Sequence, residues 1–203
     1  MNSISIGTTW ITWAPKAGLT TMSQYVDKKL ITKQDSNRII IIVRDPLLRA
    51  LSTYHYNMVN MPYTLKPPVD DNYSNLYLNI RKVYPDPSKD AYDYERFLYW
   101  IDRVLPITIT TDGHTISQTQ SWKLPNDKHW RLTDIPIEWW CLEDLDKHLL
   151  QTFGWVTTKQ NKQDYNQKQC LKYLELEGVQ DALYKYYADD FAAYKTATAT
   201  DSN

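Results

Sequence analysis

The segment Pro15–Thr21 combines residue types that bind an anion. It follows a predicted strand over residues 4–14 and precedes a run with helical periodicity. A strand that turns into a helix leaves backbone N–H groups unpaired at the helix N-terminus, where the helix dipole favours negative charge. Lys16 adds a positive charge, and Gly18 permits a close backbone approach to the ligand. The lysine precedes the glycine, which differs from a Walker A loop and disfavours an ATP-type P-loop. The alternative interpretation is a tight strand-to-helix turn with a solvated lysine.

A second candidate anion site begins at Arg44, directly after the β-branched run 39–43. Open α/β sheets bind ligands at the carboxyl ends of their strands, and a guanidinium group matches the geometry of a phosphate. Ser52 adds a hydroxyl if its helix face turns toward the same ligand. Two anion sites at the ends of adjacent parallel strands predict a ligand with two separated phosphate-like groups. The alternative is that Arg49 and Ser52 form a solvated helix face.

The elements that must position these residues indicate an α/β protein. Strand 4–14, a helix over 22–30 and strand 39–43 make one βαβ unit, which requires parallel strands. The other predicted elements are a helix from Pro46, a helix over 94–105, a short strand over 107–110, a strand over 135–142, a helix from Leu145 that Gly154 ends, and a last helix through 183–194. We expect a P-loop-like parallel sheet flanked by helices, as a three-layer αβα single domain.

The expected domain spans residues 1–195. Prolines interleave with Asn, Asp and Tyr over residues 59–89, which predicts an irregular excursion or lid. The Thr/Ala-rich residues 196–203 are predicted to be a flexible tail.

Composition narrows the classes of function. The net charge of −1 over 203 residues disfavours a general nucleic-acid binder, which needs a basic surface. Two cysteines, Cys141 and Cys170, show neither a disulfide framework nor metal-ligand spacing, and no metal is expected. The sequence shows no signal peptide and no apolar run long enough to span a membrane, so a soluble, cytoplasmic protein is expected.

Together, the two anion motifs resemble those of one enzyme family. "PKAGLTT" resembles the 5′-phosphosulfate loop of sulfotransferases that use 3′-phosphoadenosine-5′-phosphosulfate (PAPS), and "VRDPLLRALSTY" resembles their 3′-phosphate segment. Three later stretches are similar to the carbohydrate, glycosaminoglycan-type branch: "FLYWI…DGHTISQTQSW", "CLEDLDKHLLQTFGW" and "LYKYYADDFAAY". The resemblance covers most of the chain except residues 59–89.

The resemblance implies a transfer of the sulfuryl group from PAPS to an acceptor hydroxyl, with a saccharide as the acceptor and 3′,5′-bisphosphoadenosine (PAP) as the product. Lys16 would neutralise the charge that builds on the leaving oxygen. The implied cofactor-binding residues are Lys16, Ala17, Gly18, Leu19, Thr20 and Thr21 for the 5′ side, and Arg44, Arg49 and Ser52 for the 3′ side. Leu19 departs from the family, which has Ser or Thr there.

His114 matches a family histidine that is a candidate general base. A side chain with a pKa near neutral suits the removal of an alcohol proton at pH 7. The implied substrate-binding residues are Gln118, which would orient the acceptor or the base, and His55, which is a rival base. Glu95 and Glu143 are further alternatives for the base. Two other functions compete: a catalytically inactive PAP-binding module, and a nucleotide kinase-like phosphotransferase that would need Mg²⁺.

Overall fold

The computed structural model describes residues 2–13, 37–64, 72–86, 93–121, 135–156 and 167–200. The chain divides into two compact units rather than the expected single domain. The sheet unit consists of Met1–Pro46, Ser117–Lys162 and Tyr187–Asn203, and the helical unit consists of Leu47–Ile116 and Gln163–Tyr186. The division arises because the chain leaves the sheet after its third strand, builds a helical unit, and then returns for the fourth strand.

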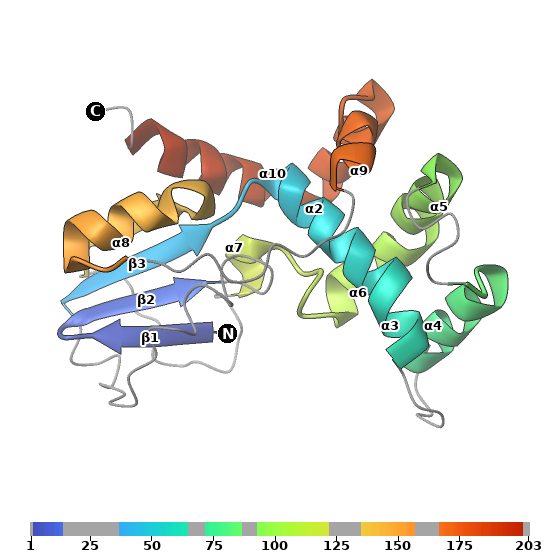
Figure 1. The fold of residues 1–203 in the computed structure, drawn as a ribbon, viewed down its shortest axis with the longest axis horizontal. Coiled ribbons are helices and arrows are strands. Elements are labelled where there is room, and N and C mark those ends of the chain that lie inside the picture. Colours follow the sequence, from blue (N-terminus) through green and yellow to red (C-terminus); the bar gives the residue numbers. More distant parts are fainter. Residues whose placement is uncertain are drawn as a thin grey trace. The chain divides into compact units, whose positions relative to one another are not determined.

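The sheet has four strands in the order β1-β2-β3-β4, namely Asn2–Ile6, Thr9–Trp13, Arg38–Val43 and Ile137–Cys141. β1 is antiparallel to β2, which is parallel to β3 (Figure 1). β4 pairs with β3 and is parallel to it. The predicted single strand over residues 4–14 is therefore two strands. Gly7 makes the turn between them with φ +56°, a conformation that glycine adopts without a Cβ clash.

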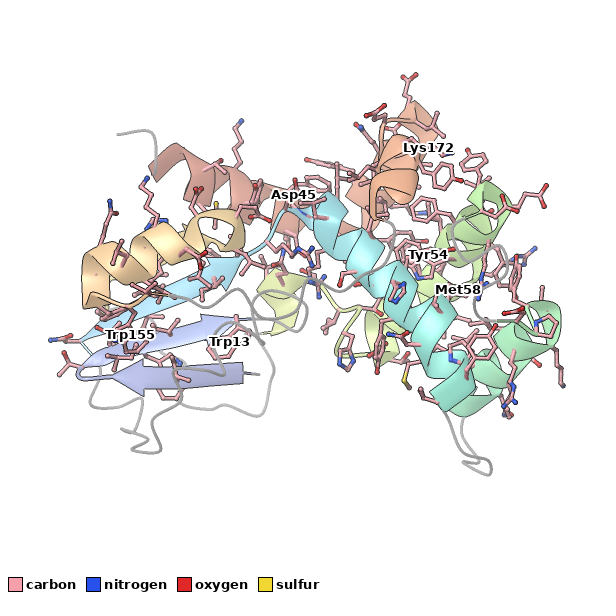
Figure 2. The ribbon with its side chains drawn as sticks, in the orientation of Figure 1. Trp13, Asp45, Tyr54, Met58, Trp155 and Lys172 are labelled. Atoms are coloured by element: carbon pink, nitrogen blue, oxygen red, sulfur yellow. The ribbon has the colours of Figure 1, made fainter. Side chains whose placement is uncertain are left out.

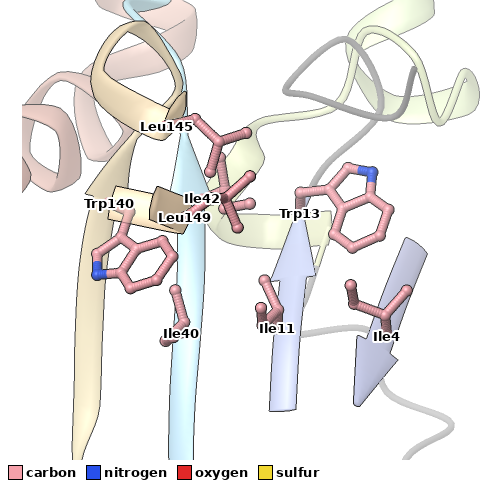
Figure 3. Packing of buried hydrophobic residues seen from close by; sticks show 8 residues of the cluster. All are labelled: Ile4, Ile11, Trp13, Ile40, Ile42, Trp140, Leu145 and Leu149. Carbon is pink, nitrogen blue, oxygen red and sulfur yellow. The ribbon is translucent and has the colours of Figure 1, made fainter. Parts of the chain in front are cut away.

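Helices cover both faces of the sheet, which explains the continuous β-branched run of β3. On one face, eight buried residues from the four strands and α8 (Leu145–Phe153) form a core (Figure 3). On the other face, Ile39, Ile41 and Val43 pack with Ala193 and Ala197 of α10 (Glu177–Thr200). The prediction of a parallel sheet flanked by helices is confirmed, and the arrangement is compatible with αβα layers.

Helix α10 corrects the expectation of a flexible tail from residue 196, because it continues to Thr200. Ala193 and Ala197 lie four residues apart and thus on one helix face, where their small side chains allow a close approach to the sheet. The helix is kinked at Tyr187, whose φ of −122° and ψ of 23° are non-helical. That residue is also where the chain passes from the helical unit to the sheet unit.

The helical unit begins with α2 (Pro46–His55), as predicted, and the same run of helix continues through a π-helical turn, Tyr56–Asn60, into α3 (Met61–Thr64). The other elements that belong to it are α4 (Asn72–Val83), α5 (Tyr94–Tyr99), a second π-helical turn (Trp100–Val104), α6 (Leu105–Thr111), α9 (Gln167–Leu174) and the first part of α10. Its core is aromatic: Tyr54 meets Phe97 and Trp100 edge-on, with ring centroids 5.1 and 5.7 Å apart.

Two local predictions in this unit are wrong. Residues 107–110 belong to helix α6 and not to a strand. The helix buries the Thr108 side chain within the unit, where its hydroxyl bonds to the Val104 carbonyl. The stretch 59–89, expected to be irregular, contains α3 and α4 within its described part, where Tyr77 and Ile80 are buried. No helix in the described ranges carries an apolar stretch long enough to cross a bilayer.

Candidate functional site

The carboxyl ends of the three parallel strands lie at one edge of the sheet. Trp13 at the end of β2 is in register with Ile42, and Val43 is in register with Cys141 at the end of β4. The chain that leaves these strands at the same edge leads into the predicted anion loop, into Arg44 and into the 3-10 turn Leu142–Asp144. The loop residues Lys16, Ala17, Gly18, Leu19, Thr20 and Thr21 lie outside the described residues. Asp45 marks the passage from β3 to α2 (Figure 2).

The backbone of Arg44 is held by the side chain of Gln118, the first residue of α7 (Gln118–Ser121). The Arg44 N–H donates to Gln118 Oε1 at 2.8 Å, and Gln118 Nε2 donates to the Arg44 carbonyl at 2.9 Å. The primary amide thus pairs with both polar groups of one residue, as a neighbouring strand does. Gln118 is 1% exposed, so its amide serves the backbone of Arg44. The amide therefore holds the residue that the sequence assigns to the phosphate.

Asp190 of α10 holds Gln118 in turn. Its fully buried carboxylate accepts the backbone N–H groups of Gln118 at 2.9 Å and Thr119 at 3.1 Å. It also accepts the Ser117 hydroxyl at 2.6 Å. A carboxylate that receives backbone N–H groups at the start of a helical turn makes charge-assisted hydrogen bonds, which are stronger than neutral ones. A continuous set of bonds therefore runs from α10 through α7 to the end of β3.

Acidic groups surround Arg44 at this edge. The N–H of Asp45 donates to Glu143 Oε1 at 3.3 Å. Burial raises the pKa of Glu143, while its bonds to backbone N–H groups and the charge of Arg44 act in the opposite direction. Burial raises the pKa of Tyr194, and the negative charges of Glu143 and Asp45 raise it further, so that this phenol stays neutral. Among the described residues, the positive charge that favours an ionised Glu143 is that of Arg44.

The second group of predicted residues lies in the helical unit, around His114. The backbone N–H of His114 donates to Asp112 Oδ1 at 2.9 Å, and its ring Nδ1 lies 3.1 Å from the same oxygen. The Asp112 side chain is 4% exposed and the His114 side chain 42% exposed. The ring of Tyr56 lies against that of His114, with centroids 4.2 Å apart. A buried carboxylate behind a solvent-accessible imidazole is an arrangement that can orient a histidine for proton transfer.

Arg49 and Thr53 of α2 anchor the backbone of this loop. Arg49 Nη2 donates to the Ile116 carbonyl at 2.5 Å and to the His114 carbonyl at 3.3 Å. The Thr53 hydroxyl donates to the same His114 carbonyl at 3.3 Å. Arg49 is 1% exposed, and Ser52 is also buried, so neither belongs to a solvated helix face. His55, at the end of α2, is half-buried.

Two pairs of the described candidates are thus in contact: Arg44 with Gln118 in the sheet unit, and Arg49 with the backbone of His114 in the helical unit. Ser52 and His55 lie on α2 of the helical unit. Sequence reasoning missed Asp112, Tyr56 and Asp190. Asp112 stands two residues before His114, a spacing that is typical of an Asx turn and could have been noticed. The described residues hold no cluster of His, Cys, Asp and Glu that could bind a metal ion.

Comparisons with protein-family models, with curated proteins and with solved structures found no match to this chain.

Proposed function

We propose that this chain is a PAPS-dependent sulfotransferase that transfers a sulfuryl group to a hydroxyl of a carbohydrate, on a P-loop-like sheet. One observation carries the proposal. The two segments with anion-binding composition follow β2 and β3, which are adjacent, parallel and paired in register. A ligand with two phosphate-like groups at one edge of the sheet requires that arrangement of strands.

In the proposed reaction the acceptor oxygen attacks sulfur in line with the bond from sulfur to the 5′-phosphate oxygen. That bond breaks, PAP leaves with the electron pair, and the acceptor proton passes to a base. Lys16 would stabilise the charge on the leaving oxygen, and the N–H groups from Gly18 to Thr21 would hold the 5′-phosphate. Arg44 would bind the 3′-phosphate. The bonds from Gln118 support this role, because they fix the backbone from which the guanidinium extends.

His114 is the proposed base. Its support is the buried Asp112 carboxylate at Nδ1 and the exposure of the ring. Arg49, with its guanidinium bonded to the carbonyls of the His114 loop, is assigned to holding that loop and not to the 3′-phosphate. His55 and Glu143 remain the alternatives for the base, and each can be tested by substitution.

The test is thermal stabilisation by PAP, with AMP and with ATP plus Mg²⁺ as controls. A ligand at a hundred times its dissociation constant adds about 2.7 kcal/mol to the folded state. For a chain of this length that corresponds to a rise in Tm of roughly 5–10 °C. Arg44→Ala should remove the response. Arg38→Ala is the matched control, because Arg38 lies at the opposite end of β3 and pairs with Glu138 at 2.6 Å.

Each outcome separates the candidate functions. PAP stabilisation that Arg44→Ala abolishes and Arg38→Ala retains supports the donor site, and sulfate transfer from PAPS to an oligosaccharide then supports the enzyme. PAP binding without transfer to any of a panel of acceptors points to the inactive binding module. Metal-dependent turnover of ATP points to the phosphotransferase. A folded protein that does not respond to PAP refutes the proposal.

A further inference from the structure

His114 is held through both its ring and its backbone within the helical unit. Asp112 Oδ1 contacts Nδ1 at 3.1 Å, and the Tyr56 ring covers one face at a centroid distance of 4.2 Å. Arg49 and Thr53 bond the carbonyl of the same residue. A surface histidine with no chemical duty needs neither of the two ring contacts, since an exposed side chain loses rotamer entropy when it is fixed.

The contact with Asp112 determines which ring nitrogen carries the proton. Oδ1 already accepts the backbone N–H of His114 at 2.9 Å, so it faces the ring as an acceptor. An ionised carboxylate only accepts hydrogen bonds, and Nδ1 must therefore be the donor. In the neutral ring the lone pair then resides on Nε2, and no hydrogen bond joins Nε2 to any described residue.

We propose that Asp112 is a positioning residue that holds His114 in its Nδ1–H tautomer, so that Nε2 can accept the proton of the acceptor hydroxyl. The proposal rests on the proposed function for the identity of that hydroxyl. As the new S–O bond forms and the bond to PAP breaks, the hydroxyl proton moves to Nε2. The ring becomes an imidazolium whose Nδ1–H remains bonded to the Asp112 carboxylate, which stabilises the positive charge.

A purely structural Asp112 would explain less of the geometry. An Asx turn requires that Oδ1 accept the His114 backbone N–H, and the structure contains that bond. It does not require the ring to rotate back onto the same oxygen. The Asp112 Oδ2 atom meets the Thr115 hydroxyl at 3.3 Å and the Tyr77 hydroxyl at 3.4 Å, so the carboxylate is anchored independently of the ring. The ring contact is the part of the geometry that serves proton transfer.

The first measurement needs no substrate. Long-range ¹H–¹⁵N spectra of the histidine rings report which nitrogen is protonated, and the chain has only 4 histidines to assign, with His114→Gln identifying the relevant signals. We expect the Nδ1–H tautomer for His114 in the wild type at a pH where the ring is neutral. In Asp112→Ala we expect the Nε2–H tautomer, which an unrestrained histidine favours. An Nε2–H tautomer in the wild type would overturn the proposal, whether or not the protein transfers sulfate.

The second measurement uses PAPS and an oligosaccharide acceptor. Asp112→Asn keeps the Asx turn, and with it the fold, but removes the negative charge. General base catalysis contributes about 10²–10⁴-fold, and loss of the positioning carboxylate should lower kcat by roughly 10–10²-fold while KM for the acceptor and PAP binding stay unchanged. The matched control is Asp93→Asn, at the exposed N-cap of α5, where Asn caps equally well.

The outcomes distinguish the two levels of the proposal. A kcat that Asp112→Asn leaves unchanged overturns the positioning role even if transfer occurs. If the chain transfers no sulfate, the proposed function fails, and the tautomer spectra still decide whether Asp112 controls the ring. Should Asp112→Ala fail to fold, the wild-type spectrum and the Asp112→Asn kinetics remain sufficient to refute or support the assignment.

Discussion

The bond between Gln118 and Arg44 allows a direct test of how the end of β3 is held. Gln118→Met keeps the volume of the side chain and removes its donor and its acceptor. The Arg44 N–H and carbonyl then lose partners at 2.8 and 2.9 Å. Each bond contributes about 1 kcal/mol net, and a buried polar group left without a partner costs about 1–3 kcal/mol. We therefore expect a local loss of stability of roughly 2–4 kcal/mol.

Hydrogen exchange of the Arg44 amide is the direct assay, because it reports local opening of this peptide and does not require the two units to unfold together. About 1–3 kcal/mol of the loss falls on the N–H, which corresponds to exchange that is roughly 5- to 150-fold faster. PAP affinity should fall by about 2- to 10-fold, because the ligand must then immobilise the arginine itself. Gln151→Met, at an exposed position of α8, is the matched control.

Arg44 exchange that stays at the wild-type rate in a folded Gln118→Met protein would refute this reasoning. It would mean that the peptide is held by the sheet alone and that Gln118 is free to serve another role. Faster exchange with unchanged PAP affinity would retain the structural role of Gln118 and remove its link to the ligand.

Three further predictions concern other contacts of the sheet unit. Desolvation raises the pKa of Glu143, so the folded state loses stability as pH rises from the ordinary carboxyl pKa toward the raised one. Because Glu143 is exposed, solvent screens the effect, and Glu143→Gln should be only slightly more stable than wild type at pH 7 and equal to it at low pH in urea unfolding. Leu149→Ala should cost about 2–5 kcal/mol, while the exposed neighbour Leu150→Ala costs little, by the same assay. Ending the chain after Lys195 should cost about 1 kcal/mol by removing Ala197 from the sheet, whereas ending it after Thr200 is neutral.

Sequence reasoning succeeded where one local signal determines the structure. The β-branched run 39–43 predicts a strand buried on both faces, and the two helical layers account for it. Gly154 was predicted to end the helix from Leu145, and it does so with φ +70°. In both cases the residues that decide the conformation are adjacent in sequence.

Sequence reasoning failed where tertiary packing overrides the secondary-structure propensity of a segment. The run Ile107–Thr110 consists of β-branched residues in which isoleucine and threonine alternate, a pattern that favours a strand. It is helical because tertiary packing that buries Thr108 outweighs this propensity. Within the helix the hydroxyls of Thr108 and Thr111 find acceptors in the carbonyls four residues earlier. The Thr/Ala repeat after residue 195 resembles a disordered tail, and only the sheet face that accepts Ala197 makes it a helix.

The candidate site shows the same contrast between contacts that are local in sequence and contacts that are not. Asp112 and His114 are two residues apart, so their contact was within reach of the sequence. Gln118 meets Arg44 across 74 residues of chain, and Asp190 meets Gln118 across 72. One sequence cannot reveal such pairs, because the chain between them can take any path. This is why Gln118 was assigned to the acceptor, whereas its amide lies on the backbone of Arg44.

The two arginines of the Arg-Asp-Pro segment illustrate this limit, and they can be separated by experiment. Arg44 and Arg49 look equivalent in sequence, but Arg49 is buried and donates to the carbonyls of His114 and Ile116. Hydrogen bonds from a charged donor are worth about 1.5–3 kcal/mol each, so Arg49→Ala should cost roughly 3 kcal/mol or more of stability, and lysine, without the planar fork, should not restore it. Arg44→Ala should cost less stability than Arg49→Ala and should abolish PAP binding. If instead Arg49→Ala unfolds at the wild-type urea concentration and loses PAP binding, Arg49 contacts the ligand and the anchoring role is wrong.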